Sequence, residues 1–493
     1  MSNPQHSAYD TFGEMSDADV NSLASDLTKI VGADRVLTGA EALARFPGDQ
    51  SWLTSIHAHY GKPLNRPDVV VSPLTTKEVS AIMALAWQRK VPVTPVGGAS
   101  GVQGAANANC GGILLNLIDM NKVRDLDMAA LTCTVEPGMI VKTFEEELNT
   151  KGLSFTHFPA SAEWASVGGS VAARGSGVLS TKYGNIQDHV LSAEVVLPNG
   201  NIVELPSVPK HGVGPELTQL FVGSEGTLGV ITAVRVKLRK VPVKRRFSVF
   251  SFETLSHGIE AGRQIMTSGL RPAVMRLYDK DAATKSLERA VQAGLEGVTM
   301  VLMVDGDHEK MIDVEGALCD EICLANGANR LPAGIGEAWW NKRYDFYHPP
   351  HAPQLPQIWC TMDAVADFEH IEALYNNVTQ ALRDSVDPKW GLTLKTHLSH
   401  WFDWGAMIYP RVIIPKGPDD LHEALELHDS FVNAASLAAV RSGGMINDHH
   451  GVGMRLAPHL ESQFGTTGMA LLRDIKNGID PDHILCPGKL NMR

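Results

Sequence analysis

Residues 92–104 read Pro-Val-Thr-Pro-Val-Gly-Gly-Ala-Ser-Gly-Val-Gln-Gly, and residues 223–232 read Gly-Ser-Glu-Gly-Thr-Leu-Gly-Val-Ile-Thr. We expect each of these runs of small residues to leave a strand. Where side chains are missing, backbone N–H groups can approach the phosphates or ring carbonyls of a ligand. A tight turn would explain either run alone, so a single run leaves both interpretations open. The two runs in this order are the strongest indication of a ligand site in the chain.

Length and composition set limits on the rest. A chain of 493 residues is too long for one core, so two or three domains are expected. With 44% hydrophobic and 20% charged residues, the composition is that of an ordinary globular protein. The formal charge of −12 argues against nucleic acid as a partner.

Targeting features are absent from the sequence as printed. It has no uninterrupted apolar stretch long enough for a membrane span. The first ten residues lack the basic and apolar regions of a secretion signal, and the last four residues carry no peroxisomal or lipidation signal. We therefore expect a short disordered lead-in, no membrane span and a cytoplasmic protein.

Apolar periodicity and turn residues predict the main elements. We expect helices at 15–30, 76–90, 142–150, 256–268 and 471–477, and strands at 68–72, 91–95, 112–117, 132–138, 247–252 and 298–304. The strand–helix–strand order over 68–95 predicts a parallel pair with a right-handed crossover. Asn199-Gly200 predicts a β-hairpin within 190–205. The prolines of 345–357, a segment that also carries His348 and His351, predict a loop.

The six cysteines are scattered along the chain. Only Cys319 and Cys323 are close, one helical turn apart, and no second pair completes a metal site. We expect both to be buried core thiols.

A third segment links the two glycine-rich runs to a known family. Residues 159–177 read Pro-Ala-Ser-Ala-Glu-Trp-Ala-Ser-Val-Gly-Gly-Ser-Val-Ala-Ala-Arg-Gly-Ser-Gly, and residues 183–188 read Tyr-Gly-Asn-Ile-Gln-Asp. With the two runs, in this order and spacing, they resemble the flavin-contacting segments of the FAD-binding vanillyl-alcohol oxidase / p-cresol methylhydroxylase (PCMH) superfamily. The resemblance covers nearly the whole chain.

The resemblance implies an α+β fold, with a split FAD-binding domain of the PCMH type and a central α+β cap domain over the flavin. Composition changes after the basic segment 235–246, which places a boundary near 245. The implied division is therefore 1–245 for the FAD-binding domain with two α+β subdomains, 246–450 for the cap, and 451–493 for a C-terminal segment that returns to the flavin domain.

The resemblance also implies the cofactor contacts. The pyrophosphate would lie against 96–103, and backbone from 166–169 and 229–231 would hold the isoalloxazine ring. The implied FAD-binding residues are Pro95, Val96, Gly97, Gly98, Ala99, Ser100, Gln103, Pro159, Ala160, Ser166, Val167, Gly169, Ser170, Arg174, Ser176, Tyr183, Glu225, Gly229, Val230 and Ile231. Relatives that tether the flavin often place a histidine in the first loop. Here Ala99 and Ser100 stand there, so non-covalent FAD is expected.

Two branches of the superfamily compete. Residues 223–243, 276–279 (Arg-Leu-Tyr-Asp) and 448–453 (Asp-His-His-Gly-Val-Gly) resemble alkyldihydroxyacetonephosphate synthases, which exchange an acyl for an alkyl group without net oxidation. Residues 484–490 (Ile-Leu-Cys-Pro-Gly-Lys-Leu) are more similar to FAD-linked D-2-hydroxy-acid dehydrogenases, such as the D-lactate and glycolate enzymes.

Those dehydrogenases often hold a divalent metal, through a Gly-His-x-Gly-Asp-Gly-Asn-x-His run and a Glu before the final His-Gly. The corresponding stretch 395–405 lacks this pattern, and His449 stands at the Glu position. We therefore predict no metal, with His397, His400 and His449 as the alternative site.

Proton chemistry is assigned by the resemblance to the synthases. Tyr409 aligns with a tyrosine proposed to handle protons there, although a buried tyrosine bonded to backbone is the alternative. His449 and His450 match the synthase histidine cluster, and neutral imidazole accepts a hydroxyl proton near pH 7. Neighbouring residues of a strand point to opposite faces, so one of the two histidines should be structural.

Two arginines are candidates for anchoring an anionic substrate. Arg276 lies between apolar neighbours, where an unpaired charge is costly, and Arg343 is the second candidate. A guanidinium offers a planar donor fork to a carboxylate or phosphate.

The sequence thus predicts an FAD-dependent oxidoreductase that transfers a hydride from a 2-hydroxy acid or related alcohol to flavin N5. The alternatives are the ether-forming synthase reaction and a flavin-binding protein without turnover. The expected partners are a small anionic or alcohol substrate and an electron acceptor, which could be oxygen, a quinone or an electron-transfer protein. A homo-oligomer, in the simplest case a homodimer, is also expected.

Overall fold

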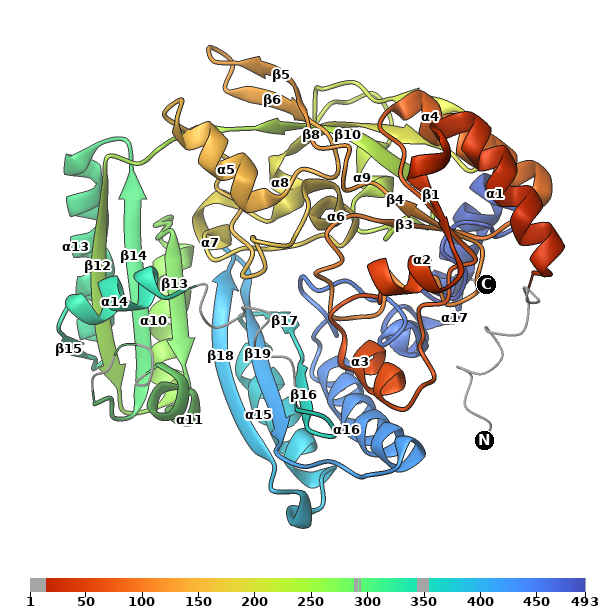
Figure 1. Cartoon of the computed structure of the whole chain (residues 1–493). Coiled ribbons are helices and arrows are strands. Elements are labelled where there is room, and N and C mark those ends of the chain that lie inside the picture. Colours follow the sequence, from red (N-terminus) through yellow and green to blue (C-terminus); the bar gives the residue numbers. More distant parts are fainter. Residues whose placement is uncertain (1–14, 288–290, 292–293, 344–353, 493) are drawn as a thin grey trace.

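The computed structural model describes residues 15–287, 291, 294–343 and 354–492 (Figure 1). The predicted lead-in, together with His348 and His351, lies outside these residues. Residues 354–357, the described end of the predicted loop, contain no helix or strand.

The first subdomain is a four-stranded sheet in the order β1 (Val36–Thr38), β2 (Val69–Val71), β4 (Ile113–Asn116), β3 (Val93–Val96). Its helices include α1 (Asp17–Val31), α2 (Gly39–Arg45) and α4 (Thr76–Arg89). Ser16 begins α1 by accepting a hydrogen bond from the backbone of Asp19. The predicted strands β2 and β3 are parallel, but the prediction that they pair is wrong, because β4 lies between them and pairs with both.

The second subdomain is a five-stranded antiparallel sheet in the order β5 (Val123–Asp127), β6 (Thr132–Val135), β10 (Val230–Lys237), β8 (Val190–Val196), β9 (Ile202–Glu204). The helices α5 (Val141–Asn149), α6 (Val167–Ala172), α7 (Ser180–Tyr183), α8 (Ile186–His189) and α9 (Thr218–Phe221) belong to this part of the chain. Two further short strands, β7 (Leu153–Ser154) and β11 (Arg239–Lys240), pair with each other. The hairpin predicted at Asn199-Gly200 is confirmed, since β8 pairs with β9 and Gly200 has a φ of 89°.

The third sheet begins at Lys244 and contains eight strands. Seven run in the order β15 (Asn329–Leu331), β12 (Lys244–Phe252), β14 (Val298–Gly306), β13 (Val274–Tyr278), β18 (Thr393–Trp401), β19 (Gly405–Ile414), β16 (Ile358–Thr361), and β17 (Ala364–Asp367) pairs with β19. Its helices include α10 (Leu255–Thr267), α13 (Glu309–Ala325), α14 (Gly334–Asn341), α15 (Ile371–Asp384) and α16 (Leu421–Arg441).

Alternation along these strands separates a helix-covered face from a face that carries polar groups. Leu398 and Ile408 are paired across β18 and β19, and both join the core that includes side chains of α10, α13, α15 and α16. The next pair, His397 and Tyr409, therefore points to the opposite face. Cys319 and Cys323 of α13 lie in the helix-covered core, as predicted.

The C-terminal segment contacts the first two sheets. Helix α17 (Leu460–Ile479) includes the predicted helix 471–477 but begins eleven residues earlier. Beyond it, Leu485 forms a parallel bridge with Val93, and Nζ of Lys476 donates to the carbonyl oxygen of Thr227. Figure 1 shows the C-terminus beside the first subdomain.

One helix of the N-terminal part departs from the simple division of the chain. Helix α3 (Trp52–His59) places Trp52 and Ile56 in the core of the third sheet. The indole nitrogen of Trp52 donates to the carbonyl oxygen of Gln357, and its ring stacks on His428. None of the helices in the described ranges is both long and apolar enough to cross a bilayer.

Candidate active site

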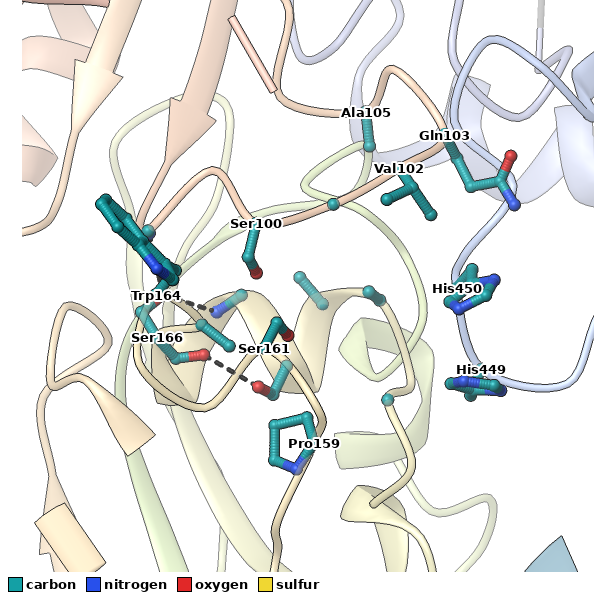
Figure 2. Close-up of a pocket in the computed structure, with 18 of the residues that line it drawn as sticks. Ser100, Val102, Gln103, Ala105, Pro159, Ser161, Trp164, Ser166, His449 and His450 are labelled. Carbon is teal, nitrogen blue, oxygen red and sulfur yellow. Dashed lines mark hydrogen bonds between the residues drawn. The ribbon is translucent and has the colours of Figure 1, made fainter. Parts of the chain in front are cut away.

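A cavity of about 360 Å³ lies where the glycine-rich segments meet the polar face of the third sheet. Figure 2 shows Ser100, Val102, Gln103 and Ala105 on one segment, Pro159, Ser161, Trp164 and Ser166 on another, and the two histidines opposite. Most of the residues predicted to bind FAD line this cavity. They are Pro95, Val96, Gly97, Gly98, Ala99, Ser100, Gln103, Pro159, Ala160, Ser166, Gly169, Ser170, Ser176, Glu225, Gly229, Val230 and Ile231.

Three residues predicted to bind FAD do not line the cavity. Val167 is fully buried in the core of the second subdomain. Arg174 is exposed, with a φ of 58°. The hydroxyl of Tyr183 donates to Oδ1 of Asp305 at 2.7 Å, so this side chain ties α7 to β14 rather than facing the cavity.

The glycines of the first loop are required by contact with the third segment. A Cβ atom on Gly98 would lie 1.6 Å from the carbonyl oxygen of Trp164, and one on Gly97 would lie 2.1 Å from Oγ of Ser166. Ser166 also begins α6, because its Oγ accepts from the backbone of Gly169 at 3.2 Å. In the sequence analysis these glycines are explained by the close approach of a ligand phosphate. The structure shows that contact between 92–104 and 159–177 already excludes a side chain at Gly98.

Several buried polar atoms on the cavity wall have no hydrogen-bond partner among the described residues. They are Oγ of Ser176, Oγ of Ser399, Nε2 of His397 and both ring nitrogens of His157. Unsatisfied buried polar groups are costly, so this wall fits a ligand that supplies donors and acceptors along its length. A flavin dinucleotide, with phosphates, hydroxyls and ring carbonyls, is such a ligand.

Glu225 connects the second glycine-rich run to the C-terminal segment. Its carboxylate accepts hydrogen bonds from the backbone N–H groups of Val452 and, at 2.7 Å, of Gly453. Burial raises the pKa of Glu225 to about 7, although the two backbone donors favour the charged form.

The polar face of β18 and β19 supplies the chemistry-bearing side chains. The rings of His397 and Tyr409 stack with centroids 4.9 Å apart. The pairing of the two strands shifts between Ser399 and Trp401, and His400 at this bulge has a φ of 49°. His397, Ser399, His400 and Tyr409 all line the cavity.

His449 and His450 lie in a turn and not in a strand, so the prediction that they face opposite sides is wrong. Their ring centroids are 4.2 Å apart, and both rings line the cavity. Nε2 of His450 lies 3.3 Å from the hydroxyl of Tyr409.

Two buried carboxylates neighbour the histidines. Nδ1 of His449 lies 3.0 Å from Oδ2 of Asp363 and 3.1 Å from Oδ2 of Asp448. Nδ1 of His450 lies 2.7 Å from Oδ1 of Asp363, and Nδ1 of His400 lies 2.8 Å from Oδ2 of Asp448.

These contacts give neighbouring imidazoles opposite protonation states near neutral pH. Burial disfavours the imidazolium of His449, but the carboxylates of Asp363 and Asp448 outweigh it and raise its pKa to about 10. Burial lowers the pKa of His450, and it lowers the pKa of His400 to about 4. His449 is therefore a cation beside a neutral His450, which is able to accept a proton.

The two arginine candidates occupy different places. Arg276 of β13 is 9% exposed, lines the cavity and lies over the ring of Trp339, 5.6 Å from its centroid. Arg343, just after α14, lies 3.8 Å from the ring centroid of Trp340 and is not among the residues that line the cavity. Of the two predicted anion anchors, only Arg276 is brought to the site.

Two groups of side chains have potential metal-ligand atoms within 4.8 Å of one another. One is Asp363 with His449 and His450, and the other is His400 with Asp448 and His449. His397 belongs to neither of these groups, so the predicted alternative set of three histidines is not assembled. Both carboxylates contact His449, the charged imidazole, which offsets part of their charge.

Sequence reasoning missed Asp363 and His157. His157 lies two residues before the third segment, and its position next to that segment is the available signal. Asp363 precedes His449 by 86 residues and no motif marks it. Only the folding of the third sheet brings Asp363 next to the turn at 448–450 that carries the two histidines.

Comparisons with known proteins agree with this geometry. The model of the FAD binding domain family matches residues 67–206, and that of the C-terminal domain of FAD linked oxidases matches residues 241–490. The alkyldihydroxyacetonephosphate synthase of Caenorhabditis elegans is 27% identical over 468 residues, which cover 88% of this chain and 78% of the relative. The mitochondrial D-lactate dehydrogenase [cytochrome] of Arabidopsis thaliana is 30% identical over 436 residues, which cover 87% of this chain and 74% of the relative.

A solved structure shows the fold. The crystal structure of p-cresol methylhydroxylase with substrate bound superimposes with a TM-score of 0.74 at 16% identity, covering 97% of each chain. This likeness bears on the fold alone, and it confirms the predicted PCMH-type α+β architecture.

Proposed function

The chain belongs to the FAD-linked oxidases, enzymes whose cofactor is FAD, and from this premise we propose that it oxidises a 2-hydroxy acid or a related alcohol. One observation carries the proposal. A buried cation, Arg276, and a neutral proton acceptor, His450 with Tyr409, line the same cavity as the three glycine-rich segments. An anionic alcohol is the substrate that uses both.

Arg276 would bind the carboxylate of the substrate. A guanidinium presents two parallel donors to a carboxylate, which fixes the position of the substrate as well as its charge. The guanidinium lies over the ring of Trp339, with Cζ 5.6 Å from the ring centroid.

Tyr409 and His450 would manage the hydroxyl proton. Oxidising an alcohol to a carbonyl removes a hydride from carbon and a proton from oxygen. Bound FAD supplies the acceptor for the hydride. The proton passes to Nε2 of His450, either directly or through the hydroxyl of Tyr409, which lies 3.3 Å away.

The cationic His449 would stabilise negative charge on the substrate oxygen as the proton leaves. Its ring faces the same cavity, and its charge is maintained by Asp363 and Asp448. Because these groups are buried, their interactions are stronger than they would be in water.

The ether-forming reaction of the synthases is the second candidate. The similarity to the C. elegans synthase and the histidine turn 448–453 favour it. The same tyrosine and histidines would then move protons without net oxidation. A flavin-binding protein without turnover is disfavoured by membership of an oxidoreductase family.

Anaerobic mixing of the purified protein with a panel of substrates separates these proposals. The panel contains D-lactate, L-lactate, glycolate, longer 2-hydroxy acids, aryl alcohols and an acyl-dihydroxyacetone phosphate. Stable bleaching of the flavin by a hydroxy acid supports the oxidation. Release of fatty acid from the acylated compound supports the synthase reaction. If no compound of the panel bleaches the flavin or releases fatty acid, both proposed reactions are wrong.

Further features of the biology remain proposals. We propose a cytoplasmic homodimer that passes electrons to oxygen, a quinone or an electron-transfer protein.

We also propose that the chain divides into the FAD-binding domain at 1–245, the cap at 246–450 and a C-terminal segment at 451–493. Helix α3 of the first domain packs against the cap.

A further inference from the structure

Asp363 lies at the centre of the polar cluster beside the cavity. Its side chain is 1% exposed and sits in the two-residue link between β16 and β17. Oδ2 accepts hydrogen bonds from the backbone N–H groups of Asp448 at 3.0 Å and of His449 at 2.8 Å. This carboxylate therefore fixes the backbone of the turn that carries both histidines.

The same carboxylate faces both imidazole rings, one with each oxygen. Oδ1 lies 2.7 Å from Nδ1 of His450, at an angle outside that of a hydrogen bond, and Oδ2 lies 3.0 Å from Nδ1 of His449. A carboxylate against Nδ1 favours a hydrogen on that nitrogen, as it does in carboxylate–histidine pairs of many active sites. In His450 this leaves Nε2, the atom 3.3 Å from the hydroxyl of Tyr409, as the free acceptor.

The surroundings of the two histidines differ in one respect. Nδ1 of His449 lies between two carboxylates, since Oδ2 of Asp448 is 3.1 Å away on the other side. The ring of His450 lies beside one carboxylate, that of Asp363, and beside the hydroxyl of Tyr409. The position of Asp363 thus allows one ring to stay charged while its neighbour stays neutral.

We propose that Asp363 is a positioning residue, which holds His450 as the neutral Nδ1–H tautomer facing Tyr409 and holds His449 beside it as a fixed cation. Only the kinetic consequence rests on the proposed function. The O–H bond of the substrate breaks, an N–H bond forms at Nε2 of His450, and the hydride leaves carbon for FAD. Asp363 takes no proton itself.

The tautomer is measured first, on the wild-type holoenzyme and without substrate. Nitrogen-15 NMR of histidine-labelled protein at pH 7 distinguishes imidazolium from each neutral tautomer, and His449→Gln and His450→Gln assign the signals. We expect a charged His449 and a His450 that lacks a proton on Nε2. A proton on Nε2 of His450, or a neutral His449, overturns the proposal whatever the substrate is.

Kinetics then test the consequence with a matched control. Asp363→Asn keeps the size of the side chain and should slow flavin reduction by the most active hydroxy acid by about a hundredfold or more, while the Kd for that acid changes little. Asp279→Asn is the control. Asp279 is also a buried carboxylate that accepts from backbone N–H groups, but it forms no hydrogen bond or ion pair with a histidine of the described part of the chain. We expect this variant to reduce its flavin within about threefold of the wild-type rate.

A second comparison separates positioning from general damage to the fold. If Asp363 acts through His450, Asp363→Asn should add less than about a threefold loss in a His450→Ala background. A further tenfold loss there would overturn the assignment. If Asp363→Asn does not fold, the NMR measurement decides alone, and if no hydroxy acid reduces the flavin, only the proposed function fails.

Discussion

Arg276 is the residue whose replacement most directly tests the proposed substrate class. The residue is 9% exposed, and no carboxylate of the residues that the structure describes forms an ion pair with it. The contact with Trp339 contributes about 2 kcal/mol at such a desolvated site, which does not offset the cost of burying an isolated charge. An anionic substrate in the cavity would supply a partner for this cation.

The expected magnitudes follow from the hydrogen bonds that are lost. Arg276→Lys keeps the charge but removes the two-pronged geometry, so about one charge-assisted hydrogen bond, worth about 1.5–3 kcal/mol, is lost. At 1.4 kcal/mol for each factor of ten, the Kd of the substrate should rise about ten- to a hundredfold. Arg276→Met removes the charge as well, and its Kd should rise further. The same variant should unfold at an equal or higher temperature than the wild type, because it removes the buried cation.

The assay is anaerobic stopped-flow reduction of the flavin over a range of hydroxy-acid concentrations, which separates Kd from the maximal rate. FAD content and thermal unfolding are measured on the same samples. Arg330→Lys is the control, since Arg330 lies on β15 of the same sheet, pairs with Asp320 at 2.9 Å and does not line the cavity. A Kd that is unchanged in both Arg276 variants, with normal FAD content, would refute the anchor. A marked loss of stability in Arg276→Met would refute the argument from the buried charge.

Four further outcomes are expected. Gly98→Ala should lower the unfolding temperature and the flavin absorbance, because its Cβ would lie 1.6 Å from the carbonyl oxygen of Trp164. Gly212→Ala, whose Cβ would meet no atom within 4 Å and which does not line the cavity, should alter neither, and equal behaviour of the two variants would contradict this. Acid precipitation should release the flavin into the supernatant, because residues 96–103 contain no histidine, and colour retained in the pellet would show a covalent link. The pKa of His449 in the folded protein, about 10, exceeds the ordinary value of 6.5, so its contribution to stability is fully present below about pH 6.5 and is lost as the pH rises through 10. Urea unfolding from pH 6 to 10 should therefore show a steeper decline for the wild type than for His449→Gln, and parallel curves would count against the charged histidine. Finally, His450→Ala should slow flavin reduction by about a hundred- to ten-thousandfold with FAD still bound, and a wild-type rate would place the proton acceptor elsewhere.

Local sequence patterns were sufficient to predict the main helices and strands and the binding of FAD. Strand and helix positions follow from apolar periodicity, as in α4, whose helical spacing buries Val79, Ile82, Met83 and Ala86. The hairpin at Asn199-Gly200 follows from turn chemistry that needs no distant contact. The three glycine-rich segments identified the flavin site because the residues of each segment are neighbours in the chain.

Relations between distant segments came only from the tertiary structure. No local pattern indicates that β4 separates β2 from β3, because sheet order depends on which strands bury their faces together. From the sequence, the glycine at position 98 is explained by a close ligand phosphate. In the structure, the carbonyl oxygen of Trp164, 66 residues away, already leaves no room for a side chain at Gly98.

The same distinction applies to the catalytic cluster. The chain alone marked Tyr409, His449 and His450, and it suggested that the adjacent histidines point apart, as they would in a strand. They lie in a turn because the carboxylate of Asp363 binds the backbone of that turn and contacts both rings. A sequence determines which groups are available for proton transfer. Their charge states depend on burial and on the distances to other charges, and these are fixed only when the third sheet and the C-terminal turn pack together.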